Sequence, residues 1–135
     1  MKKKLLSILI FVIILSVFLA GCQEEPSGVK TFKGVRLVSN VVELKNASLD
    51  TVKNRFDEIM RVEVRYLFHN IAGRDIRVKV NASFYDRDNT LIATVGPKNI
   101  YLLENYTERA VTPANTISYE GPGVERIDHV VLTVN

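Results

Sequence analysis

The sequence is poor in the residues that build thiol and imidazole sites. It contains one cysteine, Cys22, and only two histidines, His69 and His129. A single cysteine cannot form an internal disulfide, so the folded part of the chain depends on its hydrophobic core. Zinc sites built from several thiolates are excluded, and no His-x-x-x-His pair or phosphate-cradling glycine loop occurs. We therefore predict neither a metal nor a cofactor.

The chain also lacks a basic excess once its N-terminal leader is set apart. The formal net charge of +3 arises from 18 basic and 15 acidic residues. Lys2, Lys3 and Lys4 belong to the leader, which leaves 15 basic against 15 acidic residues. A nucleic-acid-binding domain needs a positive footprint, and this chain does not carry one. We expect no nucleic-acid partner.

The leader itself is a charged segment followed by an apolar segment. Three lysines precede a run from Leu5 to Ala20 that only Ser7 and Ser16 interrupt. This order is typical of the n-region and h-region of an export signal. As a helix the run would extend about 24 Å, which is shorter than a hydrocarbon core of roughly 30 Å. A cleaved signal is favoured over a membrane-spanning helix.

The end of the apolar run carries a specific motif. Leu19-Ala20-Gly21-Cys22 resembles the lipobox of prokaryotic lipoproteins. The resemblance implies that residues 1–21 are removed as a signal peptide and that Cys22, lipidated on sulfur with an acyl chain such as palmitate, becomes the N-terminus. The protein would then lie on the extracytoplasmic face of the cell membrane, held there by its lipid. The alternative is an uncleaved signal anchor in which Cys22 is a chance thiol.

After the lipobox, the chain divides into a tether and one domain. Residues 23–28 are polar and include Pro26 and Gly28, which predicts that residues 22–30 form a lipidated cysteine and a polar tether. Residues 31–135 have the common size of a single domain with a single core. Neither repeats nor low-complexity segments occur in them.

Alternation of apolar and polar residues dominates the domain. It is clearest in residues 60–68 and 76–84, where every second side chain is apolar. A period of two places one face of a strand against a core. Residues 69–75 between these runs form a turn-rich connector of hairpin length, which predicts two adjacent antiparallel strands.

Further short strands follow at regular spacing, and together they predict an all-β antiparallel sandwich. The remaining strands are predicted at residues 34–44, 91–95, 100–103, 107–111, 116–119 and 127–134. Residues 48–59 break the pattern, because Leu49, Val52 and Phe56 have roughly helical spacing. We predict a loop or one to two helical turns there.

Three segments carry a resemblance to a known family. Residues 82–86, Ala-Ser-Phe-Tyr-Asp, followed by a polar turn and Leu91-Ile92, resemble the F-x-L-Y-D signature of FxLYD-type immunoglobulin-like domains in prokaryotic lipoproteins. Residues 64–70 resemble the family's preceding strand that ends in asparagine, and residues 102–107 resemble its leucine-rich turn. The resemblance implies an immunoglobulin-like sandwich with a binding or accessory role, and it supplies no catalytic residues. The signature predicts that Phe84 points into the core and that Asp86 accepts backbone hydrogen bonds in the following turn.

Candidates for chemistry are few. Only His69 and His129 are near-neutral bases, and each lies at a strand end or on the polar side of a strand. No nucleophile-elbow motif accompanies them, so we predict that the protein is not an enzyme. Asp86, Asp88 and Asn89 supply oxygen ligands, but the Gly and distal Glu of a calcium loop do not follow. A hydrogen-bonded turn is the favoured interpretation of that segment.

Three sequons predict acceptor sites for N-glycans, at Asn46, Asn81 and Asn105. The alternative is chance, because Asn and Ser are common residues. Asn81 is the informative position, since it projects from the outward face of a predicted strand. A glycan there would require that face to be exposed.

These features favour a non-enzymatic module on the extracytoplasmic surface of the membrane. It is held to the membrane by lipid on Cys22 and presents loops or an edge strand to a protein partner in the cell envelope. One alternative is an accessory subunit of a membrane complex or transporter. Another is a hydrolase that uses His69 or His129 with a carboxylate.

Overall fold

The computed structural model describes residues 31–135 of the chain. The predicted signal peptide of residues 1–21, the predicted tether of residues 22–30 and the lipidation site Cys22 lie outside the described residues and stay predictions. Within residues 31–135, no helix is long and apolar enough to span a bilayer.

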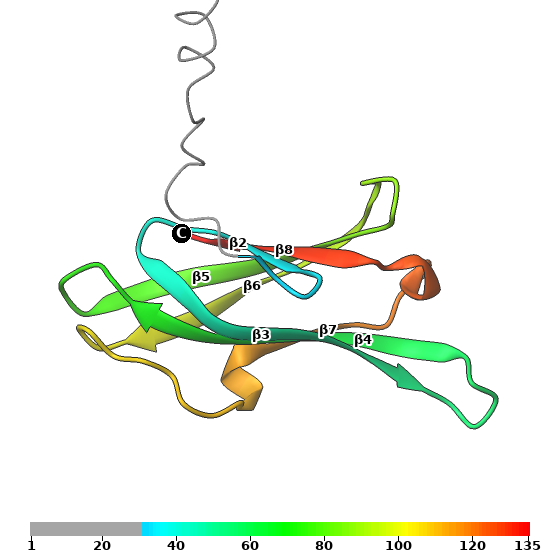
Figure 1. Ribbon diagram of the computed structural model, residues 1–135, viewed down its shortest axis with the longest axis horizontal. Helices are drawn as coiled ribbons and strands as arrows, with labels where there is room; N and C mark the ends of the chain where they lie inside the picture. The colour runs from blue at the N-terminus through cyan, green and yellow to red at the C-terminus, as the bar shows by residue number, and fades with distance from the viewer. Residues whose placement is uncertain (1–30) are drawn as a thin grey trace, which may run out of the picture.

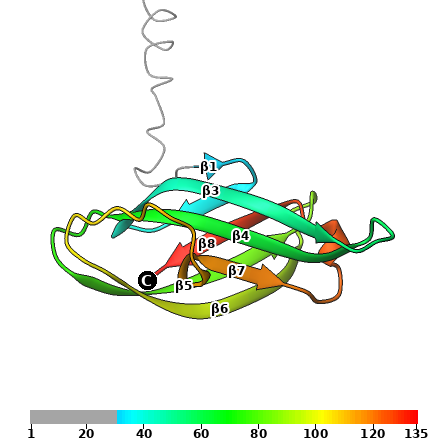
Figure 2. The same ribbon diagram turned by 90° about the horizontal axis from the view of Figure 1, so that it is seen from below.

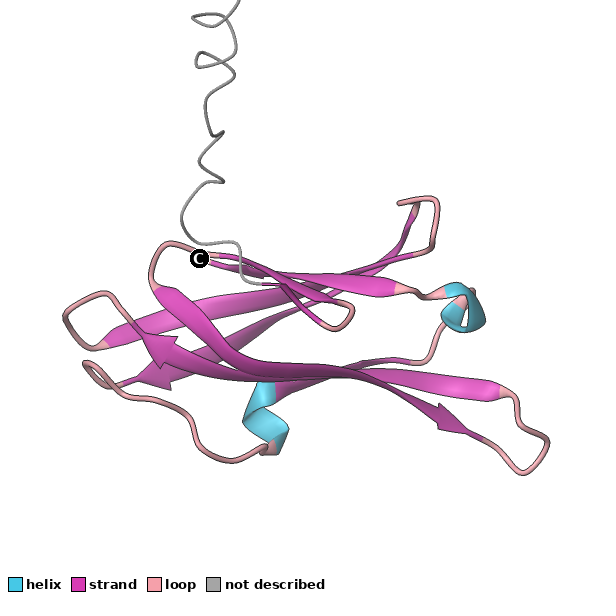
Figure 3. Ribbon diagram, viewed as in Figure 1, coloured by secondary structure: helices cyan, strands magenta, loops and turns pink. Residues whose placement is uncertain are grey.

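The described chain forms an immunoglobulin-like β-sandwich of two packed sheets (Figures 1 and 2). Sheet A has the order β1-β2-β8-β5-β6, with strands Thr31–Phe32, Val35–Val38, His129–Val134, Ile76–Tyr85 and Leu91–Leu102. Sheet B has the order β3-β4-β7, with strands Val42–Lys53, Ile59–Asn70 and Thr116–Tyr119. The described helical structure consists of two short 3₁₀ turns, η1 at Pro113–Asn115 and η2 at Val124–Arg126 (Figure 3).

Strand pairing is antiparallel with one exception. The hairpins β3–β4 and β5–β6 pair along most of their length, and β8 lies antiparallel to β5. The N-terminal strand β2 instead runs parallel to β8, with Val35 opposite Val130 and Leu37 opposite Leu132. The start and the end of the domain are therefore joined within sheet A.

The core fills the space between the sheets with side chains from both of them. Sheet A contributes Leu37, Phe84 and Leu132, and all three are at most 1% exposed. Sheet B contributes Tyr66 and Phe68, whose rings stack at a centroid distance of 4.6 Å. These residues occupy alternate positions of their strands, so the period of two in the sequence corresponds directly to the buried face.

The strongest sequence patterns gave correct strands. The predicted strands at residues 60–68 and 76–84 are confirmed as β4 and β5, and the strand at residues 116–119 is confirmed as β7. The strand predicted at residues 127–134 is β8, which begins at His129. Phe84 points into the core and is 0% exposed, as predicted.

The prediction of a single strand at residues 34–44 is wrong, because a turn at Ser39 divides it into β2 and β3. The Ser39 hydroxyl accepts hydrogen bonds from the backbone N–H groups of Val41 and Val42, both at 3.2 Å. Such a turn satisfies backbone donors locally and lets the chain pass from sheet A to sheet B.

The loop or helical turns predicted at residues 48–59 are also wrong. Strand β3 continues to Lys53, and only residues 54–58 form a turn. A β-bulge between Leu44 and Asn46 shifts the register of β3 against β4. The bulge changes which positions face the core and so disturbs the alternation in the sequence.

The two strands predicted at residues 91–95 and 100–103 are one strand, β6. Gly96 and Pro97 lie within it, at a register shift opposite Asn81. Proline cannot donate to a ladder, but β6 is the edge of sheet A, where proline is tolerated. A Cβ atom at Gly96 would lie 2.8 Å from the backbone carbonyl oxygen of Val80, and the φ of Gly96 is 132°, so this position requires glycine.

The strand predicted at residues 107–111 does not form. A single bridge joins Thr107 to His69, and the Glu108 N–H donates to the Phe68 carbonyl at 2.9 Å. The Phe68 N–H then donates to the Glu108 carboxylate at 2.8 Å, where a strand would have supplied a backbone carbonyl. The pairing ends at this side chain, and the chain continues toward η1.

Candidate functional site: a hydrogen-bonded loop end

Three loops meet at one end of the sandwich, at the left of Figure 1. They are residues 39–41 between β2 and β3, residues 71–75 between β4 and β5, and residues 103–106 after β6. We call them together the loop end. The Ile71 N–H donates to the Val41 carbonyl at 3.0 Å, which joins the first loop to the second. Loops on a rigid β-scaffold are where binding residues of sandwiches concentrate.

Asn70 ties the second and third loops from inside. Its side chain is 1% exposed, and its Nδ2 atom donates to the carbonyls of Arg74, Leu102 and Leu103 at 2.8, 3.2 and 2.8 Å. Its Oδ1 atom accepts from the Ala72 N–H at 2.9 Å. A buried amide that satisfies carbonyls of two loops fixes their relative positions, because leaving those groups unpaired is costly.

Asp75 makes a second connection at the surface. Its carboxylate accepts from the Glu104 N–H and from the Tyr101 hydroxyl, both at 2.8 Å. The hydrogen bond from Glu104, followed by that from Tyr101, lowers the pKa of Asp75 against the opposing effect of desolvation. The hydrogen bond that the Tyr101 hydroxyl donates to Asp75 raises the pKa of Tyr101. The two loops are thus held by charge-assisted hydrogen bonds as well as by Asn70.

Behind the loop end lies a half-buried carboxylate. Burial raises the pKa of Glu108, while hydrogen bonds from the Phe68 N–H and the Asn115 side chain oppose the shift. Asn115 is itself 1% exposed and donates to the Ala110 carbonyl at 3.1 Å. Burial likewise raises the pKa of Tyr66, whose hydroxyl donates to the Ala114 carbonyl. These hydrogen bonds hold residues 108–115 against β4, the strand that leads into the loop end.

The loop end presents large apolar side chains to solvent. Ile71 is 52% exposed, Leu103 is 53% exposed and Tyr106 is 46% exposed. Burying an Ile or Leu side chain is worth about 2 kcal/mol, so a partner that covered these side chains would gain free energy from them. Held by ordered loops, these side chains resemble the preorganised apolar anchors of protein interfaces.

The β3–β4 hairpin tip also exposes apolar side chains. Phe56 is 68% exposed, Met60 is 54% exposed, and the Arg55 guanidinium lies 4.7 Å from the centroid of the Phe56 ring. The tip extends beyond β7, which pairs only with residues 62–65 of β4 (Figure 1). The tip is therefore supported only by its own hairpin, whereas the loop end is formed by three loops that are hydrogen-bonded to one another.

The structure does not bring the two histidines together. His69, near the end of β4 in sheet B, has its Nδ1 atom 2.7 Å from the Thr107 hydroxyl. His129, the first residue of β8 in sheet A, has its Nδ1 atom 3.3 Å from the Asp128 carboxylate and stacks on Tyr85. Among the described contacts, one histidine has a hydroxyl partner and the other a carboxylate, so neither completes a Ser-His-Asp arrangement.

The three sequon asparagines occupy separate places. Asn46 is exposed at the bulge of β3, and Asn105 is exposed in the loop end with a φ of 56°. Asn81 projects outward from β5, as predicted, but it is half-buried. A glycan on Asn105 would cover the loop end.

Asp86 has the role predicted from the sequence. Its Oδ1 atom accepts from the backbone N–H groups of Asp88 and Thr90 at 3.0 and 2.9 Å. The hydrogen bond from Thr90 is the main cause that lowers the pKa of Asp86. Within residues 31–135, no group of three or more metal-ligating side chains occurs.

Sequence reasoning missed the loop end as a site. Asn70 and residues 102–107 belong to two segments that resemble the FxLYD family, but nothing in the sequence showed that Asn70 bonds the carbonyls of Leu102 and Leu103. The available signal was a run of apolar residues, Leu102 and Leu103, directly before a polar turn. Comparison of the chain with protein-family models, with curated proteins and with solved structures finds no match.

Proposed function

We propose that this protein is a lipid-anchored module on the extracytoplasmic face of the cell membrane, with a non-enzymatic role in binding a partner protein of the envelope. The lipobox at residues 19–22 supports the anchor. The sandwich supplies a rigid frame, and the loop end supplies the binding surface. A relationship to FxLYD-type domains agrees with this role and is part of the proposal.

The observation that carries the proposal is the combination of order and exposure at the loop end. Ile71, Leu103 and Tyr106 are about half exposed, yet they lie on loops that Asn70 and Asp75 hold in place. Preorganised apolar side chains bind partners with little entropic cost. Catalysis would need a converging base and nucleophile, and the contacts of the two histidines do not supply both.

Tether length favours a partner that is itself embedded in the membrane. Eight residues separate Cys22 from Thr31, and a fully extended chain between these two residues spans at most about 30 Å. A domain on so short a tether stays near the headgroups. An accessory subunit of a membrane complex or transporter is therefore the form of this function that we favour.

The binding surface can be tested by affinity purification from solubilised membranes of the host. The loop variant Ile71→Ser/Leu103→Ser/Tyr106→Ser is compared with wild type and with a control, Phe56→Ser/Met60→Ser, which removes exposed apolar side chains from the hairpin tip. We expect wild type and control to recover the same integral membrane protein and the loop variant to lose it. Equal recovery with the loop variant, or no specific partner at all, would contradict the proposal.

The anchor can be tested separately by intact mass and detergent partitioning. Wild-type protein should lack residues 1–21, carry lipid mass and enter the detergent phase. Cys22→Ala should keep residues 1–21 and carry no lipid mass, and intact mass decides between the two forms because the retained apolar run also enters detergent. Retention of the complete N-terminus by wild type would identify a signal anchor.

A further inference from the structure

The two outer faces of the sandwich differ sharply in charge. Strands β3 and β4 of sheet B carry both acidic and basic residues, and these form ion pairs. Glu63 bridges Arg61 at 2.8 Å and Arg65 at 2.9 Å, while Arg61 also reaches Glu120 at 3.1 Å. Charges on this face are largely compensated.

Sheet A has no compensation of this kind. Its five strands contain no Asp or Glu, and they contain Arg36, Arg77, Lys79 and Lys98. Lys98 is turned to the edge, where its ammonium donates to the carbonyls of Pro113 and Thr116. Within the described residues, Arg36, Arg77 and Lys79 form no ion pair. They are exposed and alternate with buried residues, so they project from the outer face of the sheet.

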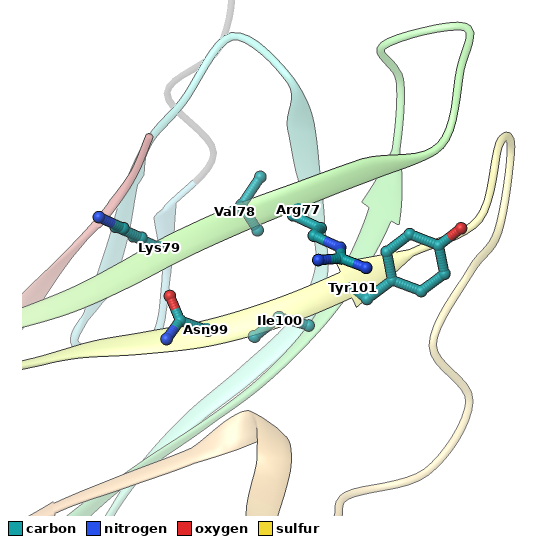
Figure 4. A pocket seen from close by; sticks show the side chains of 6 residues that line it. All are labelled: Arg77, Val78, Lys79, Asn99, Ile100 and Tyr101. Atoms are coloured by element: carbon teal, nitrogen blue, oxygen red, sulfur yellow. The ribbon is translucent and has the colours of Figure 1, made fainter.

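Two of these cations line a shallow groove of about 520 Å³ on β5 and β6, together with Asn99 and Tyr101 (Figure 4). Lys79 lies opposite Asn99 and Arg77 lies opposite Tyr101 in the register of the two strands. The Arg77 guanidinium is 5.7 Å from the centroid of the Tyr101 ring, which orients it without neutralising it. The Asp75 carboxylate accepts hydrogen bonds from the Tyr101 hydroxyl and the Glu104 N–H, and among the described residues it forms no ion pair with Arg77.

The described chain begins on this sheet. Thr31 begins β1, the edge strand of sheet A, and pairs with Arg36 of β2. Lys33, in the turn between β1 and β2, adds another exposed cation that forms no ion pair among the described residues. A tether of about 30 Å at most cannot carry sheet A far from the bilayer.

We propose that the outer face of sheet A docks on the anionic surface of the membrane through Arg36, Arg77 and Lys79, with the groove between β5 and β6 receiving lipid phosphate groups. This inference rests on the anchor at Cys22, which is one part of the proposed function, and it does not depend on the loop end. Guanidinium, ammonium and amide donors suit phosphate oxygens, and an exposed tyrosine such as Tyr101 suits the interface between headgroups and acyl chains. Each Lys or Arg near an anionic membrane contributes about fivefold to binding.

The experiment uses the full lipidated protein in vesicles. Because Cys22 is the only cysteine, a second cysteine introduced at one site is a unique label position. Thr133→Cys places an environment-sensitive dye on the outer face of sheet A, and Ser118→Cys places it on sheet B. Vesicles contain either equal parts of phosphatidylglycerol and phosphatidylcholine or phosphatidylcholine alone.

We expect the dye at position 133, but not at position 118, to be shielded from aqueous acrylamide in the anionic vesicles only. Shielding should disappear in about 1 M salt, where the Debye length is about 3 Å. Neutralising the face with Arg36→Gln/Arg77→Gln/Lys79→Gln should weaken docking on the order of a hundredfold. The matched control, Lys53→Gln/Arg55→Gln/Arg109→Gln, removes the same charge elsewhere and should retain docking.

Equal shielding in both vesicle types, or equal loss with both triple variants, would overturn the docking proposal. So would an affinity for inorganic phosphate in solution without shielding on vesicles. Failure of the anchor is distinguished by intact mass, which reports on Cys22 independently of the dye. Failure of the loop-end function is distinguished by partner recovery, which uses variants that leave sheet A unchanged.

Discussion

Asn70 shows how one side chain can determine the shape of a binding surface. It is fully buried, and its amide satisfies three carbonyls and one N–H of two loops. Only an amide supplies both donors and an acceptor at this position. Asn70 ends β4, and these contacts provide a physical reason for an asparagine at that position.

We predict that Asn70→Ala lowers the free energy of unfolding by about 2–4 kcal/mol, because it leaves buried backbone groups of two loops without partners. Asn70→Asp should be at least as harmful, since its carboxylate would face three carbonyl oxygens. Urea unfolding followed by circular dichroism measures both changes. Asn40→Ala, at an exposed turn position, is the control. If the urea midpoint of Asn70→Ala equalled that of Asn40→Ala, the hydrogen bonds of the Asn70 amide would contribute nothing to stability.

Glu108 gives a second prediction at this scale. Replacement by Gln keeps an acceptor for the Phe68 N–H and removes a half-buried charge, so stability at neutral pH should be unchanged or higher. Replacement by Ala orphans that N–H and should cost about 1–3 kcal/mol. Denaturant midpoints at neutral pH compare the two variants. A loss with Gln as large as the loss with Ala would refute the role of the acceptor.

The pH dependence of Glu108 has a defined sign. Its pKa is raised in the folded state, so the folded protein binds this proton more tightly than the unfolded chain does. The associated stability is fully present below the unfolded pKa and is lost as pH rises through the folded pKa. In Glu108→Gln, this loss should be missing when the free energy of unfolding is measured as a function of pH.

At the scale of elements, the loops and turns depend on carboxylates whose pKa is lowered in the folded state, in contrast to that of Glu108. Asp75 joins two of the three loops of the loop end, and Asp86 closes the turn between β5 and β6. Hydrogen bonds from backbone N–H groups lower the pKa of each. Their contribution to stability is present above their unfolded pKa and is lost as pH falls through the folded pKa.

We therefore predict that the melting temperature of wild type falls in the acid range and that Asp75→Asn falls less steeply there. Thermal unfolding at a series of acid pH values gives the two slopes. Asp57→Asn, which removes a carboxylate from the exposed hairpin tip, controls for the loss of one charge. Identical slopes for wild type and Asp75→Asn would mean that the contacts with Glu104 and Tyr101 do not persist in solution.

Elements with a clean period of two were predictable from sequence, and elements with a bulge were not. Strands β4, β5 and β7 bury every second residue over their core positions, so alternation identified them. Strands β3 and β6 contain register shifts at Asn46 and near Gly96, which moved apolar residues out of phase. Residues 107–111 were predicted as a strand, but the Glu108 carboxylate takes the hydrogen bond that would continue the pairing.

The candidate site was less predictable than the fold, because it depends on contacts distant in sequence. Asp86 acts on residues two and four positions ahead, and the sequence identified it. Asn70 bonds carbonyls 32 and 33 positions away, and Asp75 bonds an N–H 29 positions away. Turn chemistry is local and can be inferred from neighbours, whereas the meeting of two loops follows from how the sheets pack.

At the scale of the whole molecule, the two proposals define one orientation. Sheet A would rest on the headgroups with its unpaired cations, and sheet B with its compensated ion pairs would face away. The loop end lies at one end of both sheets (Figure 2), so it would point along the membrane toward a neighbouring protein. The near-neutral domain would thus owe its membrane preference to where its charges lie, because sheet A carries uncompensated cations while the charges of sheet B pair with one another.

The parallel pairing of β2 with β8 should determine whether the domain unfolds as one unit. Strand β2 contributes Val35 and Leu37 to the core, and within sheet A it pairs only with β8 and the short β1. If β2 belongs to the cooperative unit, Leu37→Ala should lower the free energy of unfolding by about 2–5 kcal/mol. Far-ultraviolet and tyrosine near-ultraviolet circular dichroism should then shift together in one transition. Val38→Ala, on the exposed side of the same strand, should have little effect. An unchanged main transition for Leu37→Ala would mean that β2 detaches first, which would leave β8 as an open edge for pairing with a second copy.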